Sequence, residues 1–443
     1  MKPYFLSLSS FIFCSCLETE SAESTPLNAK VYVALGEECC GEDPHPVHGA
    51  HVEDGSYVLV GKSIDAQGGT QGFVLQVNTD GLSDYVFLED ELIQQHSWSH
   101  TFGEEGAFNA ANAVAVHESG IYVVGVSTVD GTPQRLLNKY DRSENLVWSA
   151  SFPSSDGESA FEYISTTPSG GLILAGFVNG FEGGIEGFKS YGNPVGGEAN
   201  VAYLSPELLD SNSAPSSFSW ERAYDLNSIR SIRAVEDGFV FVAAYEEEWY
   251  EVVRIDGDGG ELWRTPLLDH GEATDIAVLN DDSGFVVTGH VQKEGGIDGS
   301  VTKISPDGDI LWGKSYGNPE GGSGQFSDLG SGNPALIFDE CWGVQATENG
   351  GAIIACGTGI EGCDEVEGEL YNECTSDPRT MWRSLLIEID SNGEELWSRT
   401  DSYLFDGQEA AETASEYIVK GENGVYASVM DQGFGIGLLI LGE

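Results

Sequence analysis

The residues best suited to chemistry stand near the start of the chain, where two cysteines precede three histidines. Cys39 and Cys40 are followed by His45, His48 and His51. Thiolate sulfur and imidazole nitrogen are ligands that suit zinc or copper. Steps of three residues along an extended strand turn successive side chains to opposite faces, so His48 and His51 converge only if the segment loops. We therefore favour disulfide bonds and packed or solvated histidines over a metal site here.

One recurring phrase predicts the elements that must position any site. Ile255–Trp263 returns as Ile304–Trp312 and as Ile389–Trp397, each a strand, a turn rich in Asp, Asn and Gly, and a second strand ending in Trp. Upstream stands an alternating apolar pattern with a Gly-containing turn, as in Asp275–Gly289. Four short strands per unit are typical of a propeller blade. The Asp-rich turns, such as 256–259, lack the spaced ligands of a calcium loop, so we interpret them as hairpin turns.

The tryptophans that end these units set the number of blades. They close six complete units, and their shortest spacings match the roughly 40–50 residues of a propeller blade. After Trp397 the chain supplies only three further strands, and Lys30–Leu35 is the candidate for the fourth. Pairing the two termini removes open sheet edges. We therefore predict an all-β fold, a seven-bladed β-propeller closed by an N-terminal strand that completes the last blade.

The repeats also resemble known families. The phrase Asp-x-x-Gly-x-x-x-Trp, as at Asp390 to Trp397, is similar to the docking motif of quinoprotein alcohol dehydrogenases, whose Trp residues hold neighbouring blades together. Gly295–Lys303, continuing to Trp312, more closely resembles the repeats of bacterial secreted and lipoprotein β-propellers. This resemblance spans about residues 49–441. It implies fold and location only, because that family has no shared catalytic set.

The start of the chain is typical of a targeting segment. Residues 1–16 carry an apolar run that is too short to span a membrane, which indicates a signal peptide. Its end resembles a bacterial lipoprotein signal, which implies lipid attachment at Cys16. Residues 17–28 read as a flexible acidic tether, and residues 29–443 as a single β-propeller domain. Ordinary secretion and an uncleaved start are the alternatives. We expect an extracytoplasmic protein, either a bacterial outer-membrane lipoprotein or a secreted one.

The charge of the chain restricts its partners. There are 73 Asp and Glu against 19 Lys and Arg, which gives a net charge of −54. Such a field repels nucleic acid and anionic lipid surfaces, so we expect no nucleic-acid partner and membrane contact only through a lipid anchor. Three explanations of the acidity stay open, namely adaptation to salt, a solvated surface and calcium binding. We expect a monomer.

The remaining cysteines predict disulfide bonds. Apart from Cys14 and Cys16 in the leader segment, an even number of the eight cysteines is left in an oxidising compartment. Several connectivities stay open. The candidates are one pair that flanks a hairpin and one pair within an inserted loop: Cys341 and Cys356, and Cys363 and Cys374.

Propeller topology places a second set of candidate residues at the rim of the central channel. The first strand of each blade lines the channel, and its start lies near one face. Three carboxylates at such positions would repel one another unless a cation or water intervenes, and with a cation we predict a Ca²⁺ site of Glu162, Asp275 and Glu416. The other predicted rim residues, for ligand binding, are His48, Asn112 and Trp342.

No catalytic motif stands out, and we predict no catalytic residue and no cofactor other than Ca²⁺. Long insertions gather on one face of the predicted propeller, and loops on a rigid scaffold are where function concentrates. We predict a non-enzymatic extracellular or surface-anchored protein that binds a protein or glycan ligand through this face, with Trp249, Trp342 and Trp382 as glycan-binding candidates. The alternative is an extracellular polysaccharide lyase or hydrolase with its site in the channel mouth. An enzyme requires titratable groups that converge in a concave pocket.

Overall fold

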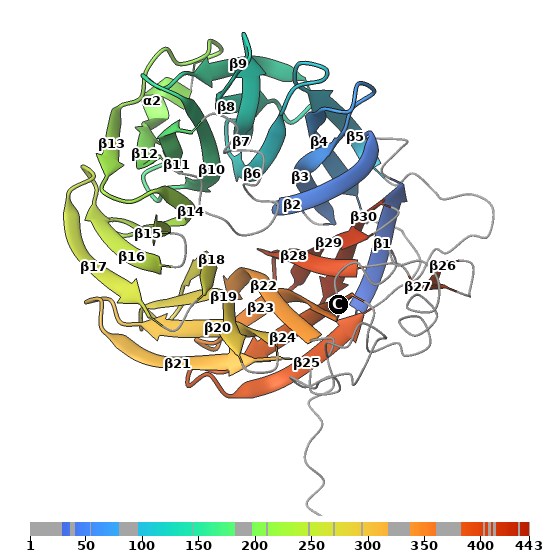
Figure 1. Cartoon of the computed structure of the whole chain (residues 1–443), viewed down its shortest axis with the longest axis vertical. Helices are drawn as coiled ribbons and strands as arrows, with labels where there is room; N and C mark the ends of the chain where they lie inside the picture. Colours follow the sequence, from blue (N-terminus) through green and yellow to red (C-terminus); the bar gives the residue numbers. More distant parts are fainter. Residues whose placement is uncertain are drawn as a thin grey trace, which may run out of the picture.

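The computed structural model is a ring of β-sheets in which one strand of each blade lies nearest the centre (Figure 1). Within the residues that the structure describes, no helix is long and apolar enough to cross a membrane. The predicted leader and tether lie outside these residues. The described residues are 29–35, 40–53, 55–78, 96–143, 145–181, 197–209, 211–246, 249–268, 271–293, 296–317, 337–359, 382–401, 404–405, 409–410, 413–432 and 435–442.

Four sheets are each built from four consecutive antiparallel strands. The strands of the first two are β2 (Glu42–Glu53), β3 (Ser56–Ile64), β4 (Thr70–Asn78), β5 (His96–Phe102), then β6 (Ala110–His117), β7 (Gly120–Val129), β8 (Thr132–Tyr140) and β9 (Leu146–Phe152). The next two contain β10 (Glu158–Thr166), β11 (Leu172–Gly180), β12 (Glu198–Leu204), β13 (Trp220–Tyr224), then β14 (Ser228–Val235), β15 (Gly238–Glu246), β16 (Trp249–Asp256) and β17 (Glu261–Leu267). A short helix, α2 (Pro206–Leu209), lies between β12 and β13.

A fifth four-stranded sheet joins the two ends of the chain. It contains β28 (Thr413–Lys420), β29 (Tyr426–Gln432), β30 (Gly435–Leu441) and β1 (Ala29–Leu35), in which β1 pairs antiparallel with β30. The predicted closure by an N-terminal strand is thus confirmed. The pairing covers the edge that β30 would otherwise expose. Nearby in sequence, β26 (Leu404–Phe405) and β27 (Glu409–Ala410) form a two-stranded ladder.

The remaining strands form one eight-stranded sheet, so the prediction of seven separate blades is wrong. The structure has five separate four-stranded blades among its described residues. The eight-stranded sheet contains β18 (Glu272–Val278), β19 (Phe285–Lys293), β20 (Gly296–Ile304), β21 (Ile310–Tyr316), β22 (Ile337–Ala346), β23 (Ala352–Gly359), β24 (Arg383–Ile389) and β25 (Glu395–Asp401).

Strand length explains why this sheet is continuous. The pairing of β20 with β21 begins at Gly299, so the first residues of β20 extend beyond β21 and leave an open edge. The start of β22 pairs with that edge in parallel, at Gly296 and Ile297. Unpaired backbone groups at a sheet edge favour such additions. The repeats in the sequence show where each unit ends, but they do not show that two units share an edge.

Every innermost strand has the same irregularity, a β-bulge where the register with the second strand shifts by one residue. The bulged residues, one from each innermost strand, are Val47, Asn112, Glu162, Arg230, Thr274, Trp342 and Glu416. A bulge re-aims the side chains around it, so these positions and those that follow them decide what faces the centre of the ring.

The bulge also explains why the second strand often carries Gly. A side-chain carbon at Gly289 would lie 1.9 Å from the carbonyl oxygen of Glu272, and one at Gly125 would lie 2.0 Å from that of Ala110. Gly61 is equally confined. The innermost backbone occupies the space that a side chain would need.

The Asp-rich turns are hairpin turns, as predicted. The Asp256 carboxylate accepts backbone N–H groups of Asp258 at 3.0 Å and Gly260 at 2.7 Å. Asp390 accepts those of Asn392 and Glu394, both at 2.8 Å. The backbone hydrogen bond from Glu394, followed by that from Asn392, holds the pKa of Asp390 below its ordinary value. Each of these carboxylates therefore stabilises the backbone of its own turn.

The repeated Trp residues join neighbouring units through these turns. Trp263 donates its indole N–H to the carbonyl oxygen of Pro306 in the next hairpin at 3.0 Å. Its ring also covers Gly308, where a side-chain carbon would lie 2.8 Å from the indole. Trp220 covers Gly259 in the same way, and Trp312 covers Gly393. The turn glycine of one unit is therefore the docking surface for the Trp of the unit before it.

We expect Gly259→Ala to destabilise the protein by about 1–3 kcal/mol, because Gly259 has a positive φ and a close neighbour. Its φ is +82°, and a side-chain carbon there would lie 3.1 Å from the Trp220 ring. Gly257→Ala in the same turn is the control, because nothing lies within 4 Å of that position. It should change the free energy of unfolding by less than about 0.5 kcal/mol. Urea unfolding measures both; equal effects would contradict the docking role.

Candidate functional site

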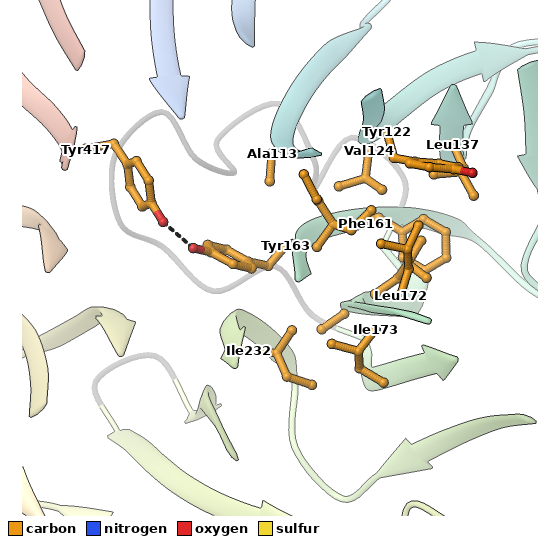
Figure 2. Close-up of a cluster of buried hydrophobic side chains, with 14 of the residues drawn as sticks. Ala113, Tyr122, Val124, Leu137, Phe161, Tyr163, Leu172, Ile173, Ile232 and Tyr417 are labelled. Carbon is orange, nitrogen blue, oxygen red and sulfur yellow. Dashed lines mark hydrogen bonds between the residues drawn. The ribbon is translucent and has the colours of Figure 1, made fainter. Parts of the chain in front are cut away.

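The innermost strands meet through aromatic and charged side chains that we call the central cluster: His48, Tyr163, Arg233, Asp275 and Tyr417. The His48 ring stacks on Tyr417 with centroids 3.9 Å apart and meets Tyr163 edge-on at 5.0 Å. The hydroxyls of Tyr163 and Tyr417 hydrogen-bond to each other across the centre (Figure 2). These residues come from β2, β10, β14, β18 and β28, so closure of the ring brings them together.

An ion pair anchors the central cluster. Arg233 Nη2 donates to both carboxylate oxygens of Asp275, at 2.8 and 3.1 Å. Its guanidinium also lies 4.3 Å from the centre of the Tyr163 ring. Asp275 accepts further bonds from Ser231 Oγ at 2.6 Å and from the Val344 backbone N–H at 3.0 Å. Burial lowers the pKa of Arg233, but Asp275 and the two tyrosines raise it above the ordinary value.

The carboxylates of the predicted Ca²⁺ site do not form one group among the described residues. Asp275 is paired with Arg233. Glu162 is fully buried and accepts a hydrogen bond from Asn112 at 3.1 Å. Glu162 and Glu416 both interact electrostatically with Lys62, whose pKa burial lowers. The protein thus supplies its own cations to these carboxylates, and Ca²⁺ binding stays a prediction.

A groove lies between two neighbouring sheets, the one that ends at β17 and the eight-stranded sheet that begins at β18. It has a volume of about 750 Å³. Trp249 is 59% exposed and Leu268 is 80% exposed, so its apolar wall faces solvent. Such volumes fall in the range of ligand sites, roughly 300–1,000 Å³. The lining residues are Trp249, Tyr250, Glu251, Pro266, Leu267, Leu268, Gly271, His290, Val291, Gln292 and Ile297.

A charged network lies behind the groove and reaches it through two lining residues, Tyr250 and His290. Arg230 contacts Glu272 at 3.0 Å, and Glu272 contacts His290 at 3.3 Å. Arg230 also donates to the Tyr250 hydroxyl at 3.5 Å. Burial raises the pKa of Glu272, but Arg230 and His290 more than offset this and the pKa is lowered. Burial lowers the pKa of His290, but Glu272 and Glu340 raise it above its ordinary value.

The predicted rim residues fall into two groups, the bulged residues of the innermost strands and members of the central cluster. Asn112, Glu162, Trp342 and Glu416 are bulged residues. His48 and Asp275 belong to the central cluster. Trp342 lies 6.1 Å from Trp382 between ring centroids, and Trp382 is buried, so of the three glycan-binding candidates Trp249 has the largest exposed ring.

The cysteines follow the expected oxidised state where the structure describes them. Cys341 and Cys356 form a disulfide between β22 and β23. Cys40 is also disulfide-bonded. Cys16, Cys363 and Cys374 lie outside the described residues. Of the predicted histidine group, His48 enters the central cluster, whereas His51 meets Tyr57 edge-on at 5.4 Å.

Sequence reasoning misses Arg230, Glu272 and His290, the charged network beside the groove. A signal exists for the last two, because Gly289 marks the bulge that sets their register. For Arg230 the signal is absent, since Ala243 stands in the second strand where four other units have Gly. Recognising the bulge in every innermost strand is the step that would have identified Arg230.

No protein-family model and no curated protein matches this chain. Similar solved structures include the Neurospora crassa Pan2 WD40 domain, at 10% identity over 90% of each chain with a TM-score of 0.47. Chaetomium thermophilum Sqt1 is 12% identical over 90% of this chain and 96% of that chain, with a TM-score of 0.46. Strand pairing and the ring define this chain as a β-propeller repeat protein. Its likeness to bacterial secreted and lipoprotein propellers stays a prediction.

We expect His290→Gln to remove stability that depends on pH. His290 faces Glu272, Glu340 and Arg230, and its pKa is raised from 6.5 in the folded state. Its contribution is therefore full below pH 6.5 and is lost as the pH rises through the folded pKa. The difference in free energy of unfolding between wild type and variant should shrink above pH 6.5. Urea unfolding across pH, repeated in a Glu272→Gln background where the decline should weaken, measures this. A difference that does not change with pH would contradict the prediction.

Proposed function

We propose that this protein is a non-enzymatic propeller that binds a neutral glycan in the groove beside Trp249. The observation that carries the proposal is the exposed indole of Trp249 at the edge of a groove of about 750 Å³. An indole offers a flat apolar face for the C–H groups of a sugar ring. Glu251, His290 and Gln292 line the same groove and offer hydrogen bonds to hydroxyl groups.

The overall charge restricts the class of glycan. A net charge of −54 repels polyanions such as uronate-rich or sulfated polysaccharides. Glu251 and His290, which line the groove, already have charged partners, because Glu251 contacts Arg264 at 3.2 Å and His290 contacts Glu272 at 3.3 Å. An uncharged ligand leaves these pairs intact. A protein ligand at the same face is the alternative partner.

The position of the groove agrees with the face predicted to carry function. The connections from β15 to β16 and from β17 to β18 border it. The strands β11, β21 and β23, which precede the three long connections, are second or fourth strands of their units as β15 and β17 are, so their ends lie on the same side of the ring. Function on loops of a rigid scaffold is the general pattern.

An extracytoplasmic location is part of the proposal. The disulfide between Cys341 and Cys356 and the disulfide-bonded Cys40 support it, because such bonds persist in oxidising compartments. The apolar leader and Cys16 support attachment to a membrane through lipid.

We expect Trp249→Ala to weaken binding of neutral oligosaccharides by more than about tenfold, because an aromatic anchor in a groove supplies a large share of binding energy. The probes are cello-, xylo-, malto- and chito-oligosaccharides, measured by calorimetry. Phe181→Ala is the control, since Phe181 is 72% exposed and lies outside the groove. Both variants should keep the wild-type unfolding midpoint. Binding by no probe, or equal loss in both variants, would reject the groove.

A second candidate function is a polysaccharide lyase or hydrolase. The observation in its favour is that Tyr250 and His290 line the groove and contact Arg230 and Glu272 behind it, and that all four have shifted pKa values. Under our proposal we expect no turnover of a polysaccharide panel. Cleavage that is lost in both Glu272→Gln and His290→Ala, while binding is retained, would establish the enzyme instead.

A further inference from the structure

We propose that His45, Glu416 and Asp431 form a zinc site that joins the first blade to the last. One ligand atom from each of these residues lies within 4.8 Å of the others. His45 Nδ1 lies 2.9 Å from Asp431 Oδ2, and His45 Nε2 lies 3.8 Å from Glu416 Oε2. Among the described residues, this is the one group of three or more His, Cys, Asp or Glu side chains whose ligand atoms all lie this close together.

The donor types favour zinc over calcium. Imidazole nitrogen and carboxylate oxygen are both ligands that zinc accepts, and three protein ligands are the number found in open zinc sites, which complete their coordination with water. Calcium instead takes six to eight oxygen ligands, and imidazole suits transition metals. The group therefore differs from the predicted Ca²⁺ site in one ligand type and in two of its three residues.

The backbone around the three residues is held in place by the ring. His45 lies in β2, Glu416 in β28 and Asp431 in β29, so the group spans two sheets. β2 packs directly on the last sheet, where a side-chain carbon at Gly49 would lie 2.8 Å from Val429. The backbone therefore brings the three ligands together, and because the two carboxylates face different nitrogens of His45, a side chain must rotate for all three to reach one ion.

The side chains are sheltered but reachable. The exposed fractions are 17% for His45, 11% for Glu416 and 30% for Asp431. A cation therefore has an entry path through Asp431. Lys62 is a competing charge, because it interacts electrostatically with Glu416. Replacing Lys62 with an uncharged residue should therefore tighten zinc binding.

Zinc at this position would act on ring closure. The last sheet is the one that β1 completes by pairing with β30. A ligand that binds the folded state alone stabilises that state in proportion to its concentration over its dissociation constant. The midpoint of thermal unfolding should therefore rise by several degrees when zinc saturates the protein.

The test is calorimetric titration of the metal-free, unreduced full chain with ZnCl₂ and with CaCl₂, together with thermal unfolding in each. We expect saturable zinc binding, a higher unfolding midpoint with zinc, and no comparable effect of calcium. Glu416→Gln and Asp431→Asn should each weaken zinc binding by tenfold or more. Lys62→Met should strengthen it.

Glu394→Gln is the matched control, because Glu394 is 75% exposed and pairs with Lys314 far from the group. It should bind zinc as the wild type does. Absence of saturable zinc binding would overturn the proposal. Zinc binding that Glu416→Gln and Asp431→Asn leave unchanged would place the metal elsewhere and overturn it as well. Calcium binding of equal strength would reject the choice of metal.

Discussion

The β-bulge shared by the innermost strands is the constraint on which the centre of the molecule depends. It shifts the register within each strand, so that the residue after the bulge can reach the middle of the ring, as His48, Tyr163, Asp275 and Tyr417 do. The same shift brings a carbonyl oxygen to within 1.9 Å of where a side chain at Gly289 would begin. Gly near the end of the second strand is therefore a consequence of the bulge that directs side chains to the middle of the ring.

Lys and Arg are few in this chain, so their positions indicate which carboxylates are paired with a positive charge. A chain with 19 Lys and Arg against 73 Asp and Glu places Lys62, Arg230 and Arg233 beside buried carboxylates. Removing one partner of a buried pair typically costs about 3–5 kcal/mol, because the other charge is left without compensation. Asp275→Asn should therefore cost more than loss of an exposed carboxylate. The interior is close to balanced, and the large negative charge belongs to the surface.

The sequence predicts what is local and misses what depends on register between distant strands. The hairpins, the Trp that ends each unit and the N-terminal strand could be predicted, because each has a turn or an unpaired remainder as its signal. The join between β20 and β22 could not, because it depends on how far Gly296 extends past its neighbour. Asp275 was predicted as a rim residue, but its partner Arg233 was not. The residue of β14 equivalent to Asp275 is Ser231, and Arg233 lies two residues beyond it, so the repeat does not show that Arg233 meets Asp275.

The charged side chains in and behind the groove are held in fixed pairs, Glu251 with Arg264 and Glu272 with both Arg230 and His290. Catalysis by proton transfer needs a group whose pKa lies near the working pH and which has a proton to move. Burial raises the pKa of Glu272, but Arg230 and His290 lower it below its ordinary value, and burial raises the pKa of Tyr250 although Arg230 opposes it. Both shifts lead away from neutral pH, whereas the pKa of His290 is raised from 6.5, so any turnover would have to depend on His290. Tyr250 and His290 line the groove, so under our proposal they are the fixed hydrogen-bond partners of a sugar stacked on Trp249.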